Sequence, residues 1–359
     1  MKRILSLLLC TMGLFLGTEK INSQSLDFNA EYTGDFLYNI GGLKDGGGYL
    51  GYAKMGVDAD LWKGASLYLG GGTTHGIVPT ETLIGDYQVA NNIEAGNYAF
   101  LEYLSIQQSL GRFSIKIGLQ DMNENFASID AAGEYVNSSF GIHPALSTNM
   151  SVPIFPLTGL GAEIHLDIND NWHLQTAVYD GEIPSFENNP YNLNWHLNND
   201  NGALFIGEGQ YIRDNGTYEL GAFYHTAEMK YGIYANIEQE VWNNGVRNLK
   251  PFAQVSLANE IVNDQHSEVK NLRCDNYFHL AAGINLESVF SKKGDDIAGL
   301  AFTSVFLCDK KTETAIEFFY QYQITDNLLV KPDVQYIINP SGENIDNALV
   351  GILRFVVGI

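Results

Sequence analysis

The chain has 359 residues, a mean hydropathy of −0.09 and a formal net charge of −22 at pH 7. This ordinary hydropathy excludes a bundle of membrane-spanning helices, but it is compatible with a membrane barrel, whose strands alternate between apolar and polar residues. The strong acidity argues against nucleic acid and anionic lipid surfaces as partners. The high numbers of glycine (37), tyrosine (20) and phenylalanine (19) suit strands, tight turns and interfacial aromatic belts.

The first 24 residues have the organisation of a secretory signal. A positively charged start precedes an apolar run over residues 4–16, and a polar stretch follows over residues 18–24. The apolar run is too short to span a bilayer. We expect residues 1–24 to be a signal peptide and residues 25–359 to be a single barrel domain. Removal of the signal takes away three basic residues and one acidic residue, so the mature chain carries −24 instead of −22.

After residue 25, alternation between apolar and polar residues predicts sixteen strands. In the segment 49–61, for example, Met55 and Val57 share an apolar face while Lys54 and Asp58 lie on the opposite face. A period of two indicates an extended strand, and this contrast is typical of a strand with lipid on one side and water on the other. The predicted strands cover residues 26–38, 49–61, 65–71, 98–108, 113–119, 161–168, 172–178, 203–212, 217–226, 231–241, 251–257, 277–286, 297–307, 314–324, 328–338 and 348–359.

The last predicted strand alternates up to its final residue. Leu349 and Leu353 point one way, and Ile352 and Arg354 point the other way. In an open sheet such an apolar strand would form an exposed edge, whereas in a barrel it pairs with the first strand and closes the wall. The predicted fold class is therefore all-β, a transmembrane antiparallel β-barrel of about sixteen strands.

The connections between the predicted strands alternate in length. Every second connection is short and rich in Asn, Asp and Gly, as at residues 169–171 and 325–327, which suits tight hairpins. The connections at the other end are mostly longer, as at residues 72–97 and 121–160. Short turns at one end and long loops at the other are typical of barrels in the Gram-negative outer membrane. We therefore expect a multi-pass outer-membrane protein surrounded by lipid, with its tryptophans near the short turns forming an interfacial belt.

The third loop on the long-loop side, residues 121–160, is unusually apolar. Aromatic residues such as Phe126 and Phe140 need a surface to pack against, and the inner wall of the barrel offers one. We expect this loop to fold inward and to narrow the channel. Polar residues at its start would then face the aperture, namely Asp121, Asn123, Glu124, Asn125 and Asp130.

The cysteines and histidines predict a disulfide and no metal site. Cys274 and Cys308 flank the hairpin predicted from residues 277–307. If Glu287 lies roughly opposite Asp296, the two cysteines also lie opposite each other, and oxidising surroundings would preserve a bond between them. The histidines show no metal-ligand spacing, and no nucleophile elbow occurs. We expect no metal, no cofactor and no catalytic site.

Seven segments, in this order along the chain, resemble the carbohydrate-selective porin family, the glucose porin type of Gram-negative outer membranes. They are GDFLYNIGG (34–42), GLQDMNENFASID (118–130), NSSFGIHP (137–144), PIFPLTGLGA (153–162), AVYDG (177–181), YELGAFYHT (218–226) and YQYQITDNLLVKPDVQYIINPSG (320–342). The resemblance covers nearly the whole mature chain. It implies a sixteen-stranded barrel and passive, sugar-preferring diffusion through a narrowed pore.

A path for neutral, hydroxyl-rich sugars needs hydrogen-bond donors and acceptors on its wall. The inward positions of the predicted strands supply donors at Lys54, Lys116, Lys331 and Arg354 and acceptors at Glu163, Glu219, Glu317 and Asp333. We predict that Lys116 and Arg354 face Asp121, Asn123 and Glu124 of the third loop. These five residues would form the pore constriction and the sugar path.

The sequence leaves three other functions open. A charge of −24 favours a general cation-preferring porin for small hydrophilic solutes. A closed structural barrel would use the third loop as a plug. An outer-membrane enzyme would need an outward-facing serine and histidine, and no predicted strand presents the two residues two positions apart on its lipid face. For the assembly we expect a monomer or a homotrimer.

Overall fold

The computed structural model describes residues 25–195, 197–198, 200–260, 276–291, 294–307 and 310–359. Their strands form one closed antiparallel sheet. Its strands are β1 (Leu26–Gly41), β2 (Gly46–Trp62), β3 (Ala65–Gly76), β4 (Tyr98–Leu110), β5 (Phe113–Gln120), β6 (Gly159–Asp167), β7 (Trp172–Asp180), β8 (Ala203–Arg213), β9 (Gly216–His225), β10 (Lys230–Gln239), β11 (Trp242–Asn243), β12 (Asn248–Glu260), β13 (Asn276–Glu287), β14 (Asp296–Leu307), β15 (Glu313–Thr325), β16 (Leu328–Ile338) and β17 (Ala348–Gly358). Each long strand pairs with its neighbours in chain order, and β17 pairs with β1. The predicted barrel and its closure by the last strand are confirmed.

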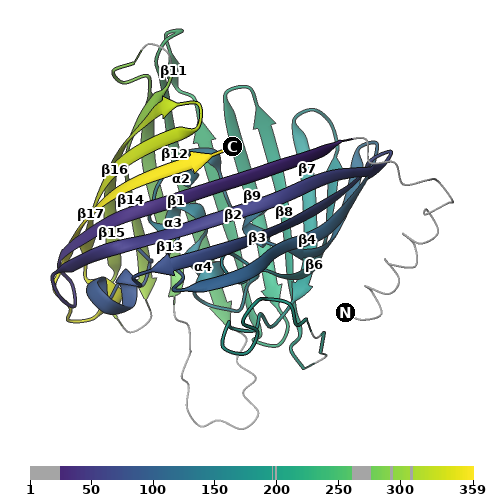
Figure 1. Ribbon diagram of the computed structural model, residues 1–359, viewed down its shortest axis with the longest axis horizontal. Helices are drawn as coiled ribbons and strands as arrows, with labels where there is room; N and C mark the ends of the chain where they lie inside the picture. The colour runs from purple at the N-terminus through teal and green to yellow at the C-terminus, as the bar shows by residue number, and fades with distance from the viewer. Residues whose placement is uncertain (1–24, 196, 199, 261–275, 292–293, 308–309) are drawn as a thin grey trace.

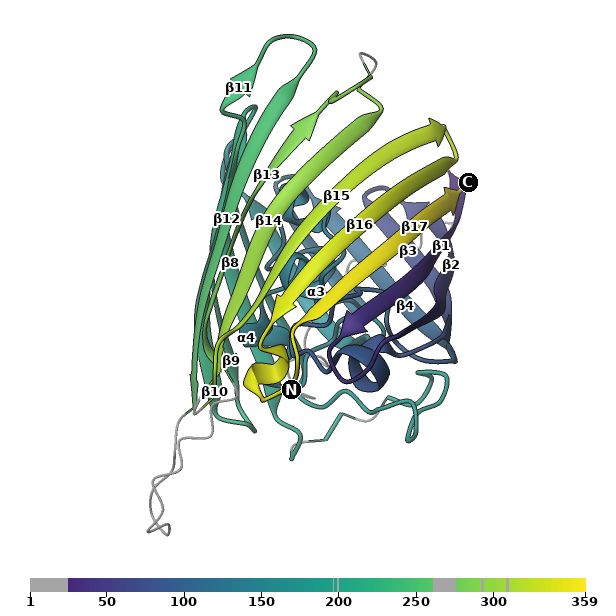
Figure 2. The same cartoon turned by 90° about the vertical axis from the view of Figure 1, so that its left-hand side faces the viewer.

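In the described part of the chain the wall contains sixteen long strands, as the alternation predicts, and β11 is an addition to them. This two-residue strand lies in the connection between β10 and β12, which also pair directly with each other. Figures 1 and 2 show β11 on a hairpin that extends beyond the other turns. Because β11 has only two residues, no period of two can reveal it in the sequence.

Several strands are longer than predicted at the long-loop end. β2 begins at Gly46 instead of residue 49, because Gly46, Gly47 and Gly48 continue the pairing with β1. β3 continues to Gly76 instead of residue 71. In both places glycine and threonine interrupt the apolar alternation while the backbone hydrogen-bond ladder continues, so the side-chain pattern ends before the strand does.

The two faces of the wall differ as the alternation predicts. On β17, Leu349 and Leu353 are 44% and 46% exposed on the outside, whereas Ile352 and Arg354 are 4% and 7% exposed on the inside. The same contrast holds along the other long strands, so the barrel presents an apolar outer surface. Among the described residues, no helix has the length and apolar character needed to cross a membrane.

Two connections at the long-loop end fold into the barrel and pack against its inner wall. We call residues 77–97 loop L2 and residues 121–158 loop L3. L2 carries one short helix, η1 (Thr80–Ile84). L3 carries four, namely η2 (Met122–Glu124), α2 (Asp130–Gly133), α3 (Ser138–Gly141) and α4 (Pro144–Ser147). A further short helix, η3 (Pro340–Gly342), precedes β17. In Figures 1 and 2 the helices of L3 lie within the outline of the barrel. Aromatic residues of L3 such as Phe126, Tyr135 and Phe140 are fully buried against the inner wall.

Two predictions concern residues that the structure does not describe. The signal peptide predicted for residues 1–24 lies outside the described residues. Cys274 and Cys308 also lie outside them, so the disulfide stays a prediction.

Candidate functional site

Inward-facing carboxylates of the wall hold L3 in place by accepting hydrogen bonds from its backbone. Glu317 on β15 accepts from the amides of Val136 and Asn137, with N–O distances of 2.5 and 3.0 Å. Glu208 on β8 accepts from Ala127 N at 3.0 Å, and Glu238 on β10 accepts from Ala131 N at 2.8 Å. Buried amides need acceptors, so these carboxylates fix the loop at several points around the wall.

The four wall carboxylates predicted as acceptors for sugars are almost entirely covered by protein. Glu163, Glu219, Glu317 and Asp333 do face inward, but each is at most 7% exposed. Glu163, for example, accepts hydrogen bonds from Asn125 of L3 at 2.9 Å and from Tyr179 of β7 at 2.6 Å. These groups support the loop and its neighbours and are covered by them.

L2 is held by the same strand that holds L3. Glu313, four positions before Glu317 on β15, accepts from Tyr87 N at 2.7 Å and from Gln88 N at 2.9 Å. Gln335 on β16 donates to the backbone oxygen of Ala90 at 2.8 Å. The sequence pattern did not predict that L2 folds into the barrel. Its buried apolar residues, among them Leu83, Ile84 and Ile93, are the same kind of signal that identified L3.

Arg354 on β17 binds the wall and L2. Its guanidinium forms a two-pronged ion pair with Asp35 of β1, with N–O distances of 2.9 and 2.8 Å. The same group donates to Asn92 Oδ1 of L2 at 2.7 Å, and Asn91 donates to Asp35 at 2.7 Å. The polar partners of Arg354 are therefore on β1 and L2, whereas the sequence grouped it with the acidic start of L3.

Asp121 and Asn123, at the start of L3, shape the loop with their side chains. Asp121 accepts from Asn123 N at 2.7 Å, which caps η2, and from Phe155 N at 2.8 Å, which ties the two ends of the loop together. The side-chain amide of Asn123 donates to the backbone oxygens of Phe126 and Gly141, both at 3.1 Å. Both side chains therefore have structural partners in addition to the cavity that they border.

Lys116 and Glu124, two of the five residues predicted for the constriction, form an ion pair between the wall and L3. Lys116 Nζ on β5 lies 3.2 Å from Glu124 Oε2 on η2. The Lys116 side chain is 10% exposed and lies 5.7 Å from the centre of the Tyr68 ring, whereas the Glu124 side chain is 48% exposed. The Glu124 carboxylate therefore faces the lumen, and the Lys116 ammonium lies behind it at the wall.

Two cavities with polar side chains in their lining lie on either side of η2. The loop cavity, of about 420 Å³, is bordered by L2, L3 and the wall, and its lining includes Tyr52, Asn92, Glu94, Asp121, Asn123, Phe155 and Arg354. The wall cavity, of about 430 Å³, lies next to the short turns of β2–β5, and its lining includes Asp58, Tyr68, Tyr103, Gln107, Lys116, Glu124 and His165. Both volumes are within the range of small-molecule sites, about 300–1,000 Å³. The five predicted residues are therefore divided between two neighbouring cavities.

Two carboxyl groups of the loop cavity have perturbed acidity. Burial raises the pKa of Glu94 in L2 to about 8, although both its oxygens accept from Thr80 N. Burial, assisted by the charge of Glu124, raises the pKa of Asp121 in L3 to about 7. The charge of this cavity therefore changes near neutral pH.

Within the described part of the chain, no group of three or more His, Cys, Asp or Glu side chains is arranged to hold a metal ion.

Comparison with known proteins identifies the family. A sequence model of one protein family, described as the carbohydrate-selective porin, OprB family, matches residues 44–230 and 226–357 of this chain. The chain belongs to this family. It is an outer-membrane porin selective for carbohydrates, and it is a channel, not an enzyme.

Individual relatives of this porin agree with that membership. Porin B of Pseudomonas aeruginosa is 24% identical over 415 residues, which cover 91% of this chain and 86% of Porin B. The high pH structure of Pseudomonas putida OprB has a TM-score of 0.81 at 19% identity and covers 93% of this chain and 94% of its own. The low pH structure of the same protein has a TM-score of 0.60, with 93% and 92% covered. At this identity the solved structures show the fold that this porin shares.

Proposed function

We propose that small sugars diffuse passively through this porin by way of the loop cavity and the wall cavity, with the Lys116–Glu124 pair at the boundary between them. The observation that carries the proposal is the position of η2. Asn123 borders one cavity, and the adjacent Glu124 and Asn125 border the other. A solute that leaves one cavity for the other therefore passes the start of L3.

The chemistry of the lining supports neutral, hydroxyl-rich solutes. The loop cavity combines amides, hydroxyls and carboxyls with the rings of Tyr52 and Phe155, whose centres are 4.7 Å apart. A sugar can replace its lost water contacts with hydrogen bonds to the polar groups while a ring face packs on an aromatic side chain. An apolar solute would leave these polar groups without partners, so the lining favours sugars over solutes of similar size that lack hydroxyls.

We expect Lys116→Ala and Glu124→Ala to alter sugar passage more than any other single change in the wall cavity. Loss of Glu124 leaves the Lys116 ammonium facing the lumen, so cation preference should fall and sugar-dependent block of the current should weaken about three- to tenfold. Loss of Lys116 should raise cation preference. The measurement is planar-bilayer conductance of each refolded variant, titrated with glucose and with salt gradients.

Lys250→Ala is the matched control for this pair. Lys250 on β12 pairs with Glu287 on β13 at 3.1 Å, also on the inner wall, but it borders neither cavity. Its removal should leave sugar block within about twofold of the unsubstituted porin. Equal behaviour of Lys116→Ala, Glu124→Ala and Lys250→Ala would remove the pair from the sugar path.

Ion selectivity should depend on pH near neutrality. The raised pKa values mean that Glu94 and Asp121 are protonated at pH 5–6 and ionised at pH 9. The loop cavity therefore gains negative charge as pH rises, and the ratio of cation to anion permeability should rise with it. Reversal potentials in a salt gradient at pH 5.5, 7 and 9 measure this ratio. Glu94→Gln should flatten the response between pH 7 and 9, and a ratio that falls with rising pH would contradict the assignment.

Two finer points stay predictions. The charge of −24 on the mature chain favours cations among the small ions that share the pore. A monomer and a homotrimer are both compatible with the closed single-chain barrel, and light scattering of the detergent-solubilised protein distinguishes them.

A further inference from the structure

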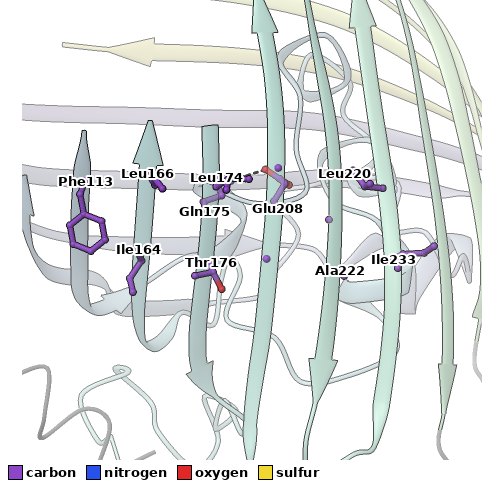
Figure 3. A pocket seen from close by; sticks show the side chains of 13 residues that line it. Phe113, Ile164, Leu166, Leu174, Gln175, Thr176, Glu208, Leu220, Ala222 and Ile233 are labelled. Carbon is purple, nitrogen blue, oxygen red and sulfur yellow. Dashed lines mark hydrogen bonds between the residues drawn. The ribbon is translucent and has the colours of Figure 1, made fainter. Parts of the chain in front are cut away.

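The outer surface of the barrel has a trough in the wall beside the short turns. Its volume is about 680 Å³, and its lining is almost entirely apolar. Figure 3 shows the side chains that line it, which come from neighbouring strands between β5 and β10. The deepest part follows β8, where Gly207 and Gly209 occupy two successive outward positions.

Cross-strand register defines the shape of this trough. Gly209 pairs with Leu174 on β7 and with Leu220 on β9, so two leucines flank a glycine. Gly207 pairs in the same way with Thr176 and Ala222, which are smaller. The trough is therefore narrow at Gly209, where a leucine stands on each side, and wider at Gly207. A depression that narrows to one strand between two leucines matches a single hydrocarbon chain better than the broad face of a second barrel.

The two glycines of the floor are not required by packing or by backbone geometry. A Cβ at Gly207 would have its nearest atoms at 3.8 Å, and a Cβ at Gly209 would have its nearest atom at 3.4 Å, which are ordinary contacts. Elsewhere in the wall, a Cβ at Gly161 would lie 2.2 Å from Tyr179 and one at Gly221 would lie 2.1 Å from Tyr234. Glycine weakens a strand interior, so two adjacent outward glycines without a packing role point to a need for open space.

A cation and three aromatic rings stand at the end of the trough nearest the short turns. Arg213 follows Gly207, Gly209 and Tyr211 on the outward row of β8 and is exposed. Its guanidinium carbon lies 5.5 Å from the ring centre of Tyr211 and 5.8 Å from that of Tyr218. Trp172 packs on Tyr211, with ring centres 4.7 Å apart. Such rings lie at the boundary between headgroups and acyl chains, and an arginine there is placed to bind phosphate.

We propose that this trough is a binding site for one glycerophospholipid, with an acyl chain over Gly207 and Gly209 and the phosphate on Arg213. From Arg213 to Gly207 the strand spans about 20 Å at about 3.4 Å per residue, or about 15 Å of depth at the usual tilt of barrel strands. That depth equals half of a hydrocarbon core of about 30 Å. The exposed Asp214 beside Arg213 favours a zwitterionic headgroup, whose ammonium it can face.

Native mass spectrometry of the full-length mature porin tests this site. The protein is reconstituted in vesicles of palmitoyl-oleoyl-phosphatidylethanolamine, extracted in mild detergent and analysed for retained lipid. We expect one phospholipid per chain on the unsubstituted porin. The double variant Gly207→Leu/Gly209→Leu, which fills the trough, should retain at least tenfold less. Arg213→Gln, which removes the phosphate contact and leaves the trough open, should retain about three- to tenfold less.

Gly351→Leu is the matched control. Gly351 faces outward on β17, and no atom lies within 4 Å of a Cβ placed there, so one leucine at this position adds apolar bulk to the outer wall away from the trough. Its lipid retention should equal that of the unsubstituted porin, and heat-dependent gel mobility confirms that each variant is folded. Equal retention by all variants would overturn the proposal, as would a change of oligomeric state on filling the trough, which would identify a second copy as the occupant.

Discussion

Arg354→Ala is expected to lower the stability of the barrel by about 3–5 kcal/mol and to widen the channel. The substitution leaves Asp35 buried without its counter-charge, since Asp35 is fully buried and binds both prongs of the guanidinium. Removal of one partner of a buried ion pair typically costs about this much. It also releases Asn92, so L2 loses a contact with the wall. Urea-dependent unfolding followed by tryptophan fluorescence measures the first effect, and single-channel conductance measures the second.

A double substitution separates the charge of this pair from its hydrogen bonds. Asp35→Asn with Arg354→Gln removes both charges together and keeps polar groups at both positions. We expect it to recover most of the stability that Arg354→Ala loses, because no uncompensated charge remains. If Arg354→Ala unfolds at the same urea concentration as the unsubstituted porin and conducts equally, the pair does not hold L2.

Glu317→Ala is expected to give the second largest effect, by loosening L3. Two buried backbone amides, of Val136 and Asn137, lose their acceptor, at a cost of about 1–3 kcal/mol for each amide. L3 should then sample positions away from β15. We expect larger and noisier single-channel currents and sugar block weakened by about tenfold. Planar-bilayer recordings with and without glucose measure both.

Glu313→Ala is the companion variant for L2. Glu313 lies on the same inward row of β15, but it accepts from Tyr87 N and Gln88 N of L2 and from Ser341 N in η3. Limited proteolysis of folded protein should therefore cut within residues 77–97 in Glu313→Ala and within residues 121–158 in Glu317→Ala. Cleavage of the same loop in both variants would show that the two carboxylates do not act on separate loops.

Alternation along the chain was sufficient to predict the wall of the barrel. In β17, for example, the outward Leu353 is exposed and the next residue, the inward Arg354, is buried, as a period of two predicts. A strand's period is a local property that the lipid and the lumen impose on every second side chain, so one sequence reveals it. The inward fold of L3 was also predictable, because Phe126 and Phe140 require an apolar surface.

What the inward groups contact was decided by the tertiary structure alone. The sequence grouped Lys116 and Arg354 with three residues of L3, but it did not predict that Lys116 pairs with Glu124, eight positions away. Arg354 pairs with Asp35, 319 positions away, and Glu317 holds Val136, 181 positions away. Closure of the barrel brings such residues together, and the folding of L2 and L3 into one lumen then determines which carboxylates are covered by backbone amides and which still face the solute. The period of a strand determines whether a side chain points to the lipid or to the lumen. Which residue an inward side chain contacts depends on where the other strands and loops lie around the barrel and along its axis.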